Sequence, residues 1–272
     1  MKNITGLIVS LIFTSCTTMK LSIPDAFKKQ ATVCHVEGAR KNKMKAGNYS
    51  TSRIKRGLHT ISPGLSNSFF LENLILSKAG LLKLEHVEKE KAKFRYSISD
   101  QKSTAEVFGQ EKELTRSIDY EVMNSKSIFN GLSQIQQYEY IFSAKIKTRG
   151  IDSAGTWELV MSNVYDREKD SVKSLFTYVL PDDNGIATNG QDTIFIKSVS
   201  IKNVESANGK TGKFPVKMLS GYELSTADGV IAIIDLLDKS VWLYNELEEK
   251  DRFIIAVITT ALFARKVNDT KW

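Results

Sequence analysis

Cysteine and proline are scarce in this chain, and each shortage excludes a class of protein. The 272 residues contain two cysteines and four prolines. Two cysteines allow one disulfide at most, which excludes small disulfide-stapled scaffolds, and a chain of this length buries enough core without such bridges. The prolines form no linker, and no repeat recurs at a fixed period, so nothing in the sequence marks a second domain.

Sequence signatures of enzyme and cofactor sites are also missing. The chain has no Gly-x-Ser-x-Gly, His-Glu-x-x-His, Walker loop, dinucleotide fingerprint or Cys-x-x-Cys. Its three histidines, His35, His59 and His86, are about 25 residues apart, whereas a zinc site usually draws two ligands from one short element. We therefore assign no catalytic, cofactor-binding or metal-ligating residue.

Two groups of acidic residues leave a hydrolase open as an alternative. Asp182 and Asp183 form one group, and Asp166, Glu168 and Asp170 form the other. Hydrolysis of a glycosidic bond needs two carboxyl groups at a defined separation across a cleft. Both groups lie in turn-like contexts, where acidic side chains usually cap backbone amides and stay solvated.

The first sixteen residues have the pattern of an export signal. Lys2 gives a short positive region, and Ile4 to Phe13 is an apolar stretch too short to span a bilayer. Two small residues and Cys16 follow. This ending resembles the lipobox of bacterial lipoproteins, in which the signal is cleaved before a cysteine that carries lipid, although Phe13 stands where Leu is usual. An ordinary secretory signal cleaved nearby is the alternative.

The resemblance to lipoproteins implies a division of the chain and a place in the cell envelope. Residues 1–15 would be the signal peptide, residues 16–30 a tether after lipidated Cys16, and residues 31–272 a single domain. The lipid, such as palmitate, would make a membrane the first partner. Thr17 stands where an inner-membrane retention signal places Asp, which favours the outer membrane. With Cys16 lipidated, Cys34 is the remaining thiol, and we expect it to be a buried structural residue.

Positive charge is concentrated just after the expected anchor. Residues 16–60 hold ten Lys or Arg and two acidic residues. The candidates for a membrane-proximal basic patch are Arg40, Lys41, Lys43, Lys45, Arg53, Lys55 and Arg56. Near a surface, anionic headgroups attract such residues by about 1 kcal/mol each. A solvated strand face or hairpin tip is the alternative, and an envelope protein is another possible contact. Nucleic acid is not expected, because the predicted export signal argues against it.

Most of the chain from Leu81 onward predicts antiparallel strands. Apolar residues alternate with more polar neighbours at a period of two, as in a half-buried strand. The clearest run is Tyr138, Tyr140, Phe142, Ala144 and Ile146. Turn residues separate such runs, and Asp228-Gly229 predicts a hairpin with a two-residue type I′ turn.

The end of the chain, from about residue 246 to residue 266, predicts a helix. Asn245 and Glu248 have the spacing of a capping box, and Arg265 and Lys266 would complement the helix dipole at the other end. The segment between them, Phe253 to Ala264, is apolar on every side. A helix of this kind must be buried on every side.

Together these patterns predict a mainly β fold with a C-terminal hydrophobic helix, in which an antiparallel barrel-like sheet encloses the helix or packs on it. Four features resemble the tubby C-terminal-like superfold, which phospholipid scramblases share. They are Gly221–Leu224, the Asp228-Gly229 hairpin, Val241–Tyr244 and the helix from Asp251 to Ala264. The resemblance implies a closed antiparallel barrel around the helix, and it carries over no set of phosphoinositide ligands.

The functional expectation is a lipid-anchored envelope protein that acts as a non-enzymatic binding or structural module, without a cofactor. The alternative is an envelope-anchored or secreted hydrolase that acts on polysaccharide or on another cell-envelope substrate.

Overall fold

The computed structural model describes residues 21, 23–66, 81–100, 102–122, 131–150, 155–169, 183–205 and 211–266. The expected signal peptide and Cys16 lie outside these residues. The N-terminal elements are α1 (Asp25–Lys28), β1 (Ala31–Glu37), β2 (Lys45–Ala46), β3 (Tyr49–Thr51), β4 (Lys55–Arg56) and β5 (Thr60–Ser66). Four longer strands follow, β6 (Leu81–Ser99), β7 (Thr104–Val122), β8 (Gly131–Arg149) and β9 (Thr156–Asp166). The last elements are β10 (Asn184–Thr188), β11 (Thr193–Glu205), β12 (Thr211–Thr226), β13 (Gly229–Asp235), β14 (Ser240–Tyr244) and α3 (Glu249–Ala264).

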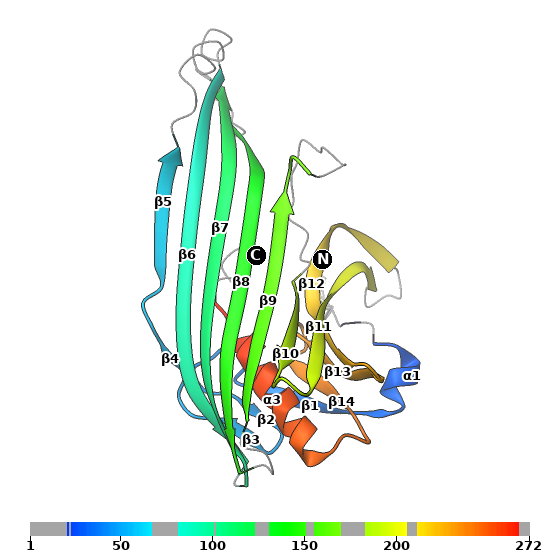
Figure 1. The fold of residues 1–272 in the computed structure, drawn as a ribbon. Helices are drawn as coiled ribbons and strands as arrows, with labels where there is room; N and C mark the ends of the chain where they lie inside the picture. The colour runs from blue at the N-terminus through cyan, green and yellow to red at the C-terminus, as the bar shows by residue number, and fades with distance from the viewer. Residues whose placement is uncertain are drawn as a thin grey trace, which may run out of the picture.

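The strands form one antiparallel sheet that closes on itself (Figure 1). Twelve strands make the ring, in the order β3-β2-β1-β14-β13-β12-β11-β10-β9-β8-β7-β6. The pairing of Ser50 and Thr51 on β3 with Ser99 and Ile98 on β6 closes it. β4 and β5 pair with the same edge of β6 beyond that point. The predicted barrel is therefore confirmed.

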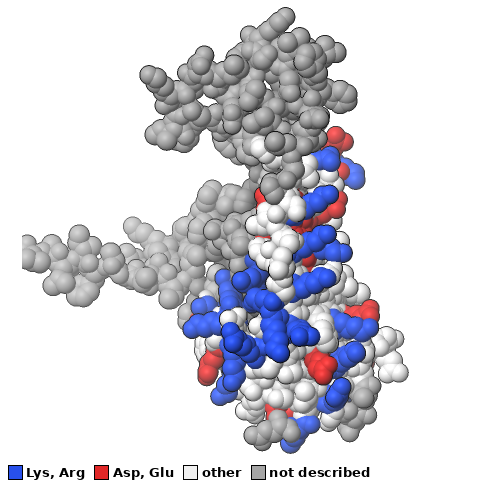
Figure 2. Space-filling view, turned by 90° about the vertical axis from the view of Figure 1, so that its left-hand side faces the viewer, with Lys and Arg blue, Asp and Glu red and all other residues white. Residues whose placement is uncertain are grey.

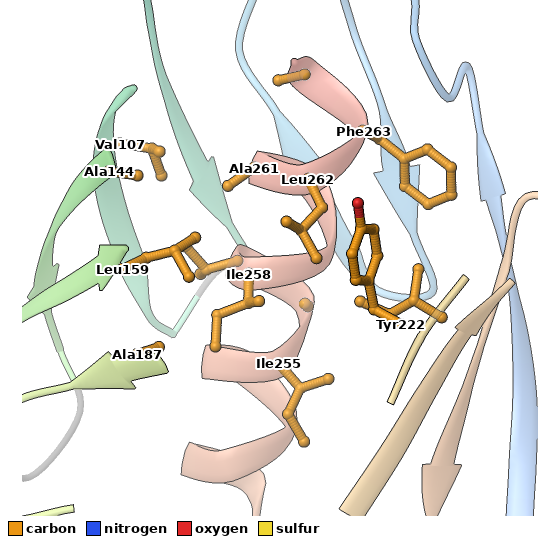
Figure 3. Close-up of a cluster of buried hydrophobic side chains, with 14 of the residues drawn as sticks. Val107, Ala144, Leu159, Ala187, Tyr222, Ile255, Ile258, Ala261, Leu262 and Phe263 are labelled. Atoms are coloured by element: carbon orange, nitrogen blue, oxygen red, sulfur yellow. The ribbon is translucent and has the colours of Figure 1, made fainter. Parts of the chain in front are cut away.

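The interior of the barrel is filled by α3 (Figure 3). All residues from Phe253 to Ala264 are buried, because the barrel surrounds the helix on every side. Inward-facing residues of the strands, such as Leu159 and Tyr222, pack against it and are themselves inaccessible. The predicted central helix is confirmed. Among the described residues, no helix is long and apolar enough to cross a membrane.

The predicted helix boundaries need correction at both ends. The N-cap is Glu248, which makes no side-chain capping hydrogen bond, while the amide oxygen of Asn245 accepts a hydrogen bond from the Thr32 hydroxyl at 2.7 Å. At the other end, Arg265 follows the last helical residue and is buried. The predicted capping box is wrong, because the side chain of Asn245 bonds to Thr32 on β1 and does not cap α3.

The hairpin between β12 and β13 is confirmed, but its turn was misplaced. Thr226 pairs with Gly229, so Ala227 and Asp228 form the turn. Gly229 has φ of 133°, and Asp228 is not among the residues with positive φ. A type I′ turn centred on Asp228 and Gly229 would need positive φ at both.

The segment before β1 packs on the outside of the barrel. Leu21 and Ile23 are buried and cluster with Ile233 of β13, and Trp242 of β14 packs against this cluster. The backbone amide of Leu21 donates to the Asp235 carboxylate at 3.3 Å. Leu21, Ile23 and Phe27 of the expected tether therefore pack on the folded domain. Phe27 belongs to α1, which Figure 1 shows at the side of the barrel.

Candidate anion-binding groove

The two basic segments predicted from the sequence lie next to each other. The amide of Ile54 donates to the carbonyl of Asn42 at 2.7 Å, which joins the two segments. Six of the seven predicted basic residues are exposed, namely Arg40, Lys41, Lys43, Lys45, Arg53 and Lys55. Arg56 is half-buried, and its Nη1 donates to the carbonyl of Ala264 at 2.6 Å. Arg56 therefore holds the C-terminal end of α3 as well as contributing charge.

Lys55 and Arg56 line a groove of about 780 Å³ on the outer face of the barrel. β4, β6, β7, β8 and β9 form its floor. The lining residues are Lys55, Arg56, Gly57, Lys93, Phe94, Arg95, Phe108, Gly109, Gln110, Ser143, Ala144, Lys145, Glu158, Leu159 and Val160. Five of them are basic and one is acidic. Figure 2 shows lysine and arginine side chains gathered on this side of the molecule.

The alternation of β6 explains why positive charge gathers here. Ala92, Phe94 and Tyr96 point into the barrel and are buried. The residues between them must therefore point outward. The exposed outward positions of this strand are Lys89, Lys91, Lys93 and Arg95. Sequence reasoning missed this row, although Lys-x-Lys-x-Lys-x-Arg at a period of two was a visible signal.

Strand register brings like charges directly opposite one another. Lys55 pairs with Arg95 across β4 and β6, and Lys91 pairs with Lys112 across β6 and β7. Like charges at directly opposite positions destabilise a sheet. Within the described residues, the structure records no ion pair that neutralises Lys55, Lys93, Arg95 or Lys145. Five basic residues and one acid line the described groove, and the acid, Glu158, pairs in register with Lys145, so the groove has a net positive charge.

An exposed aromatic ring lies between the cations. Phe108 on β7 is 43% exposed, and its register partners are Arg95 on β6 and Lys145 on β8. On β9, Val160 is 44% exposed and adjoins the same groove. The site therefore combines cations, which suit an anion, with apolar surface that suits the uncharged part of a ligand.

The described acidic residues among those considered for hydrolysis do not line this groove. Asp183 is buried, and its carboxylate contacts Arg265 at 3.4 Å and Tyr222 at 3.1 Å. Asp166 accepts a hydrogen bond from the Glu168 amide at 3.0 Å, as expected for a capping residue in a turn. Asp170 and Asp182 lie outside the described residues. The acid that does line the groove, Glu158, was not predicted.

Arg265 and Asp183 belong to a polar cluster inside the barrel at the end of α3. The Arg265 guanidinium lies over the rings of Tyr140, Phe142 and Tyr222 at 5.1 to 5.9 Å. Burial lowers the pKa of Arg265, but Tyr140, Tyr222 and Asp183 more than offset this and raise it well above the ordinary value. The buried guanidinium is therefore charged, and the cluster fixes the helix in the barrel.

Cys34 and the histidines are not gathered into one site. Cys34 is half-buried on β1, and burial, followed by the charge of Glu37, raises the pKa of its thiol. His35 lies 4.0 Å from Asp238, and His59 contacts the buried carboxylate of Glu90. In the part of the chain that the structure describes, no group of three or more His, Cys, Asp or Glu side chains is placed to hold a metal.

Comparison with protein-family models, with curated proteins and with solved structures gave no match.

Proposed function

We propose that this chain is a lipid-anchored protein of the bacterial cell envelope, a non-enzymatic module whose basic groove binds an anionic component of the envelope. The proposed location of the anchor is the outer membrane, because Thr17 follows Cys16 at the position where an inner-membrane retention signal has Asp. The observation that carries the binding function is the direct pairing of Lys55 with Arg95 in a groove that five basic residues and one acid line.

Electrostatics supports this proposal. A directly opposed pair of like charges destabilises a sheet. An anion in the groove would relieve this repulsion and gain charge-assisted hydrogen bonds from Lys93, Arg95 and Lys145. The charge is also spread over β4, β6 and β8, so the ligand would contact several strands at once.

A hydrolase is disfavoured by the arrangement of acids. Cleavage of a glycosidic bond by the usual mechanism needs two carboxyl groups on either side of the bond. Glu158 is the one acid among the described lining residues, and Asp183 is held in the barrel interior by Arg265. The groove is therefore suited to binding rather than to this chemistry.

The binding part of the proposal is tested with dextran sulfate, a general polyanion. The Lys93→Gln/Arg95→Gln variant should bind it about ten-fold more weakly than the wild type, because two charged contacts are lost. The matched control is Lys197→Gln/Lys239→Gln, which removes the same charge from exposed positions outside the groove. Equal weakening in both variants would mean that net charge, and not the groove, binds the polymer.

The anchor is tested separately by membrane fractionation and mass spectrometry. The wild type should pellet with membranes and carry lipid on Cys16. Cys16→Ala should leave the protein unprocessed or release it from the membrane. A wild type with an unmodified N-terminus at another position would contradict the anchor.

A further inference from the structure

We infer that the groove faces away from the bilayer that holds the anchor, and that its ligand is a strand of acidic polysaccharide and not that bilayer. The inference rests on the proposed function, since it takes Cys16 as the anchor and the groove as an anion site. It adds the orientation of the protein and the chemical class of the ligand.

The strand order places the N-terminal segment and the groove on opposite sides of the barrel. Leu21 and Ile23 pack on the outer face of β13, while the groove spans β6 to β9 and is centred near β7. In the ring of twelve strands, β13 and β7 are six steps apart in either direction. Figure 1 shows the same arrangement, with α1 on the right and β4 and β6 on the left.

The N-terminal segment is held in place by several contacts. The side chains of Leu21 and Ile23 are buried, and Asp235 accepts hydrogen bonds from the amides of Leu21, Leu237 and Asp238. A Cβ on Gly221 would lie 3.0 Å from a methyl carbon of Leu21, so the absent side chain leaves room for it. Leu21 is the first described residue of the chain, and it is therefore fixed on the barrel.

The chain between this point and the anchor is short. Five residue steps separate Cys16 from Leu21, and a fully extended chain spans about 18 Å over that distance. A ring of twelve tilted strands, spaced about 4.8 Å apart, has a backbone diameter of about 24 Å before side chains are added. The tether cannot reach around the barrel, so the groove cannot contact the anchoring bilayer while Leu21 stays packed.

The shape and chemistry of the groove favour a polysaccharide strand over a second bilayer. The site is hollowed, whereas a flat bilayer is better matched by a flat or protruding surface. From Lys89 to Arg95, outward-facing cations extend along β6 over about 20 Å, which suits a linear polyanion. Phe108 lies among them and offers a ring face on which the apolar side of a sugar can pack.

The test uses the full-length lipidated protein and a fluorescent oligogalacturonate, an acidic sugar polymer. Binding is measured with the protein anchored in vesicles of phosphatidylcholine, and again in vesicles that also contain phosphatidylglycerol. At physiological salt the Debye length is about 8 Å, so a groove on the far side is screened from the lipid charge. We expect the same affinity on both vesicles.

Two variants test the ligand class. Phe108→Ser should weaken oligogalacturonate binding about five-fold while leaving the binding of polyglutamate, a polyanion without sugar rings, unchanged. Phe195→Ser is the matched control, because Phe195 is also exposed on the outer face but does not line the groove.

Each outcome bears on a separate part of the inference. Loss of oligogalacturonate binding on the phosphatidylglycerol vesicles alone would mean that the groove faces its own bilayer, which overturns the orientation and leaves anion binding intact. Equal effects of Phe108→Ser on both polymers, or none on either, would overturn the polysaccharide. Failure of every polyanion to bind would contradict the proposed function, and this inference would fail with it.

Discussion

Replacing Asp183 by Asn should destabilise the protein strongly, because it removes the carboxylate that forms an ion pair with the buried guanidinium of Arg265. The two side chains are 2% and 5% exposed, and their charged atoms are 3.4 Å apart. The Asp183 carboxylate accepts hydrogen bonds from the Asn163 amide and the Tyr222 hydroxyl, each at 3.1 Å. Asn keeps the size of the side chain, and its one amide oxygen can still accept one of these bonds. The change therefore removes mainly the negative charge.

The expected magnitude follows from the burial of the pair. Breaking a buried ion pair by removing one partner costs about 3–5 kcal/mol in the free energy of unfolding. With a urea m-value of about 3 kcal/mol/M for a chain of this size, the unfolding midpoint should fall by about 1–2 M. Circular dichroism of the chain from residue 17 onward measures this midpoint.

Two further variants separate this cause from others. Asp166→Asn makes the same chemical change in a turn, where the ion pair with Lys169 is partly exposed, and should cost less than about 1 kcal/mol. Asp183→Asn/Arg265→Met removes both charges and should be more stable than Asp183→Asn alone. A double variant as unstable as the sum of its single variants would refute the claim that the two charges stabilise each other.

Three other predictions concern the core and the thiol. Ala256→Asp should prevent folding, which circular dichroism would show as loss of the signal of a folded chain. Phe263→Ala should cost about 3–5 kcal/mol in the free energy of unfolding, measured in urea. Tolerance of the aspartate would contradict a helix buried on all sides. Gly109→Ala should cost about 1–3 kcal/mol, because its Cβ would lie 2.2 Å from the ring of Phe94, and Phe94→Leu should restore part of that stability. The raised pKa of the Cys34 thiol reduces its thiolate fraction at neutral pH. Alkylation by iodoacetamide should therefore be slower than that of free cysteine until the pH is raised. A rate equal to that of free cysteine would show that burial does not control this thiol.

The barrel and its central helix could be predicted because each follows from the pattern of apolar residues within a short stretch of sequence. Alternation at a period of two along residues 138–146 requires one buried and one exposed face. The apolar run from Phe253 to Ala264 requires burial on every side, and only an enclosing sheet satisfies both conditions.

The functional details depend on contacts between residues far apart in the sequence, and these could not be predicted. Arg265 looks like a surface cation at a helix end, but the interior carboxylate of Asp183 draws it inward. Lys55 belonged to the predicted patch, yet its partner Arg95 is 40 positions away and joins it only through strand pairing. Leu21 lies in the segment that the sequence predicts to be a tether, and it is buried because it packs against Ile233.

The most direct test of the binding groove is a lysine acylation footprint with and without oligogalacturonate, read by mass spectrometry. The ligand should protect Lys55, Lys93 and Lys145, which line the groove, and leave Lys197 and Lys239 as reactive as in the free protein. Equal protection at all five lysines, or protection confined to the last two, would contradict the groove as the site that binds the anion.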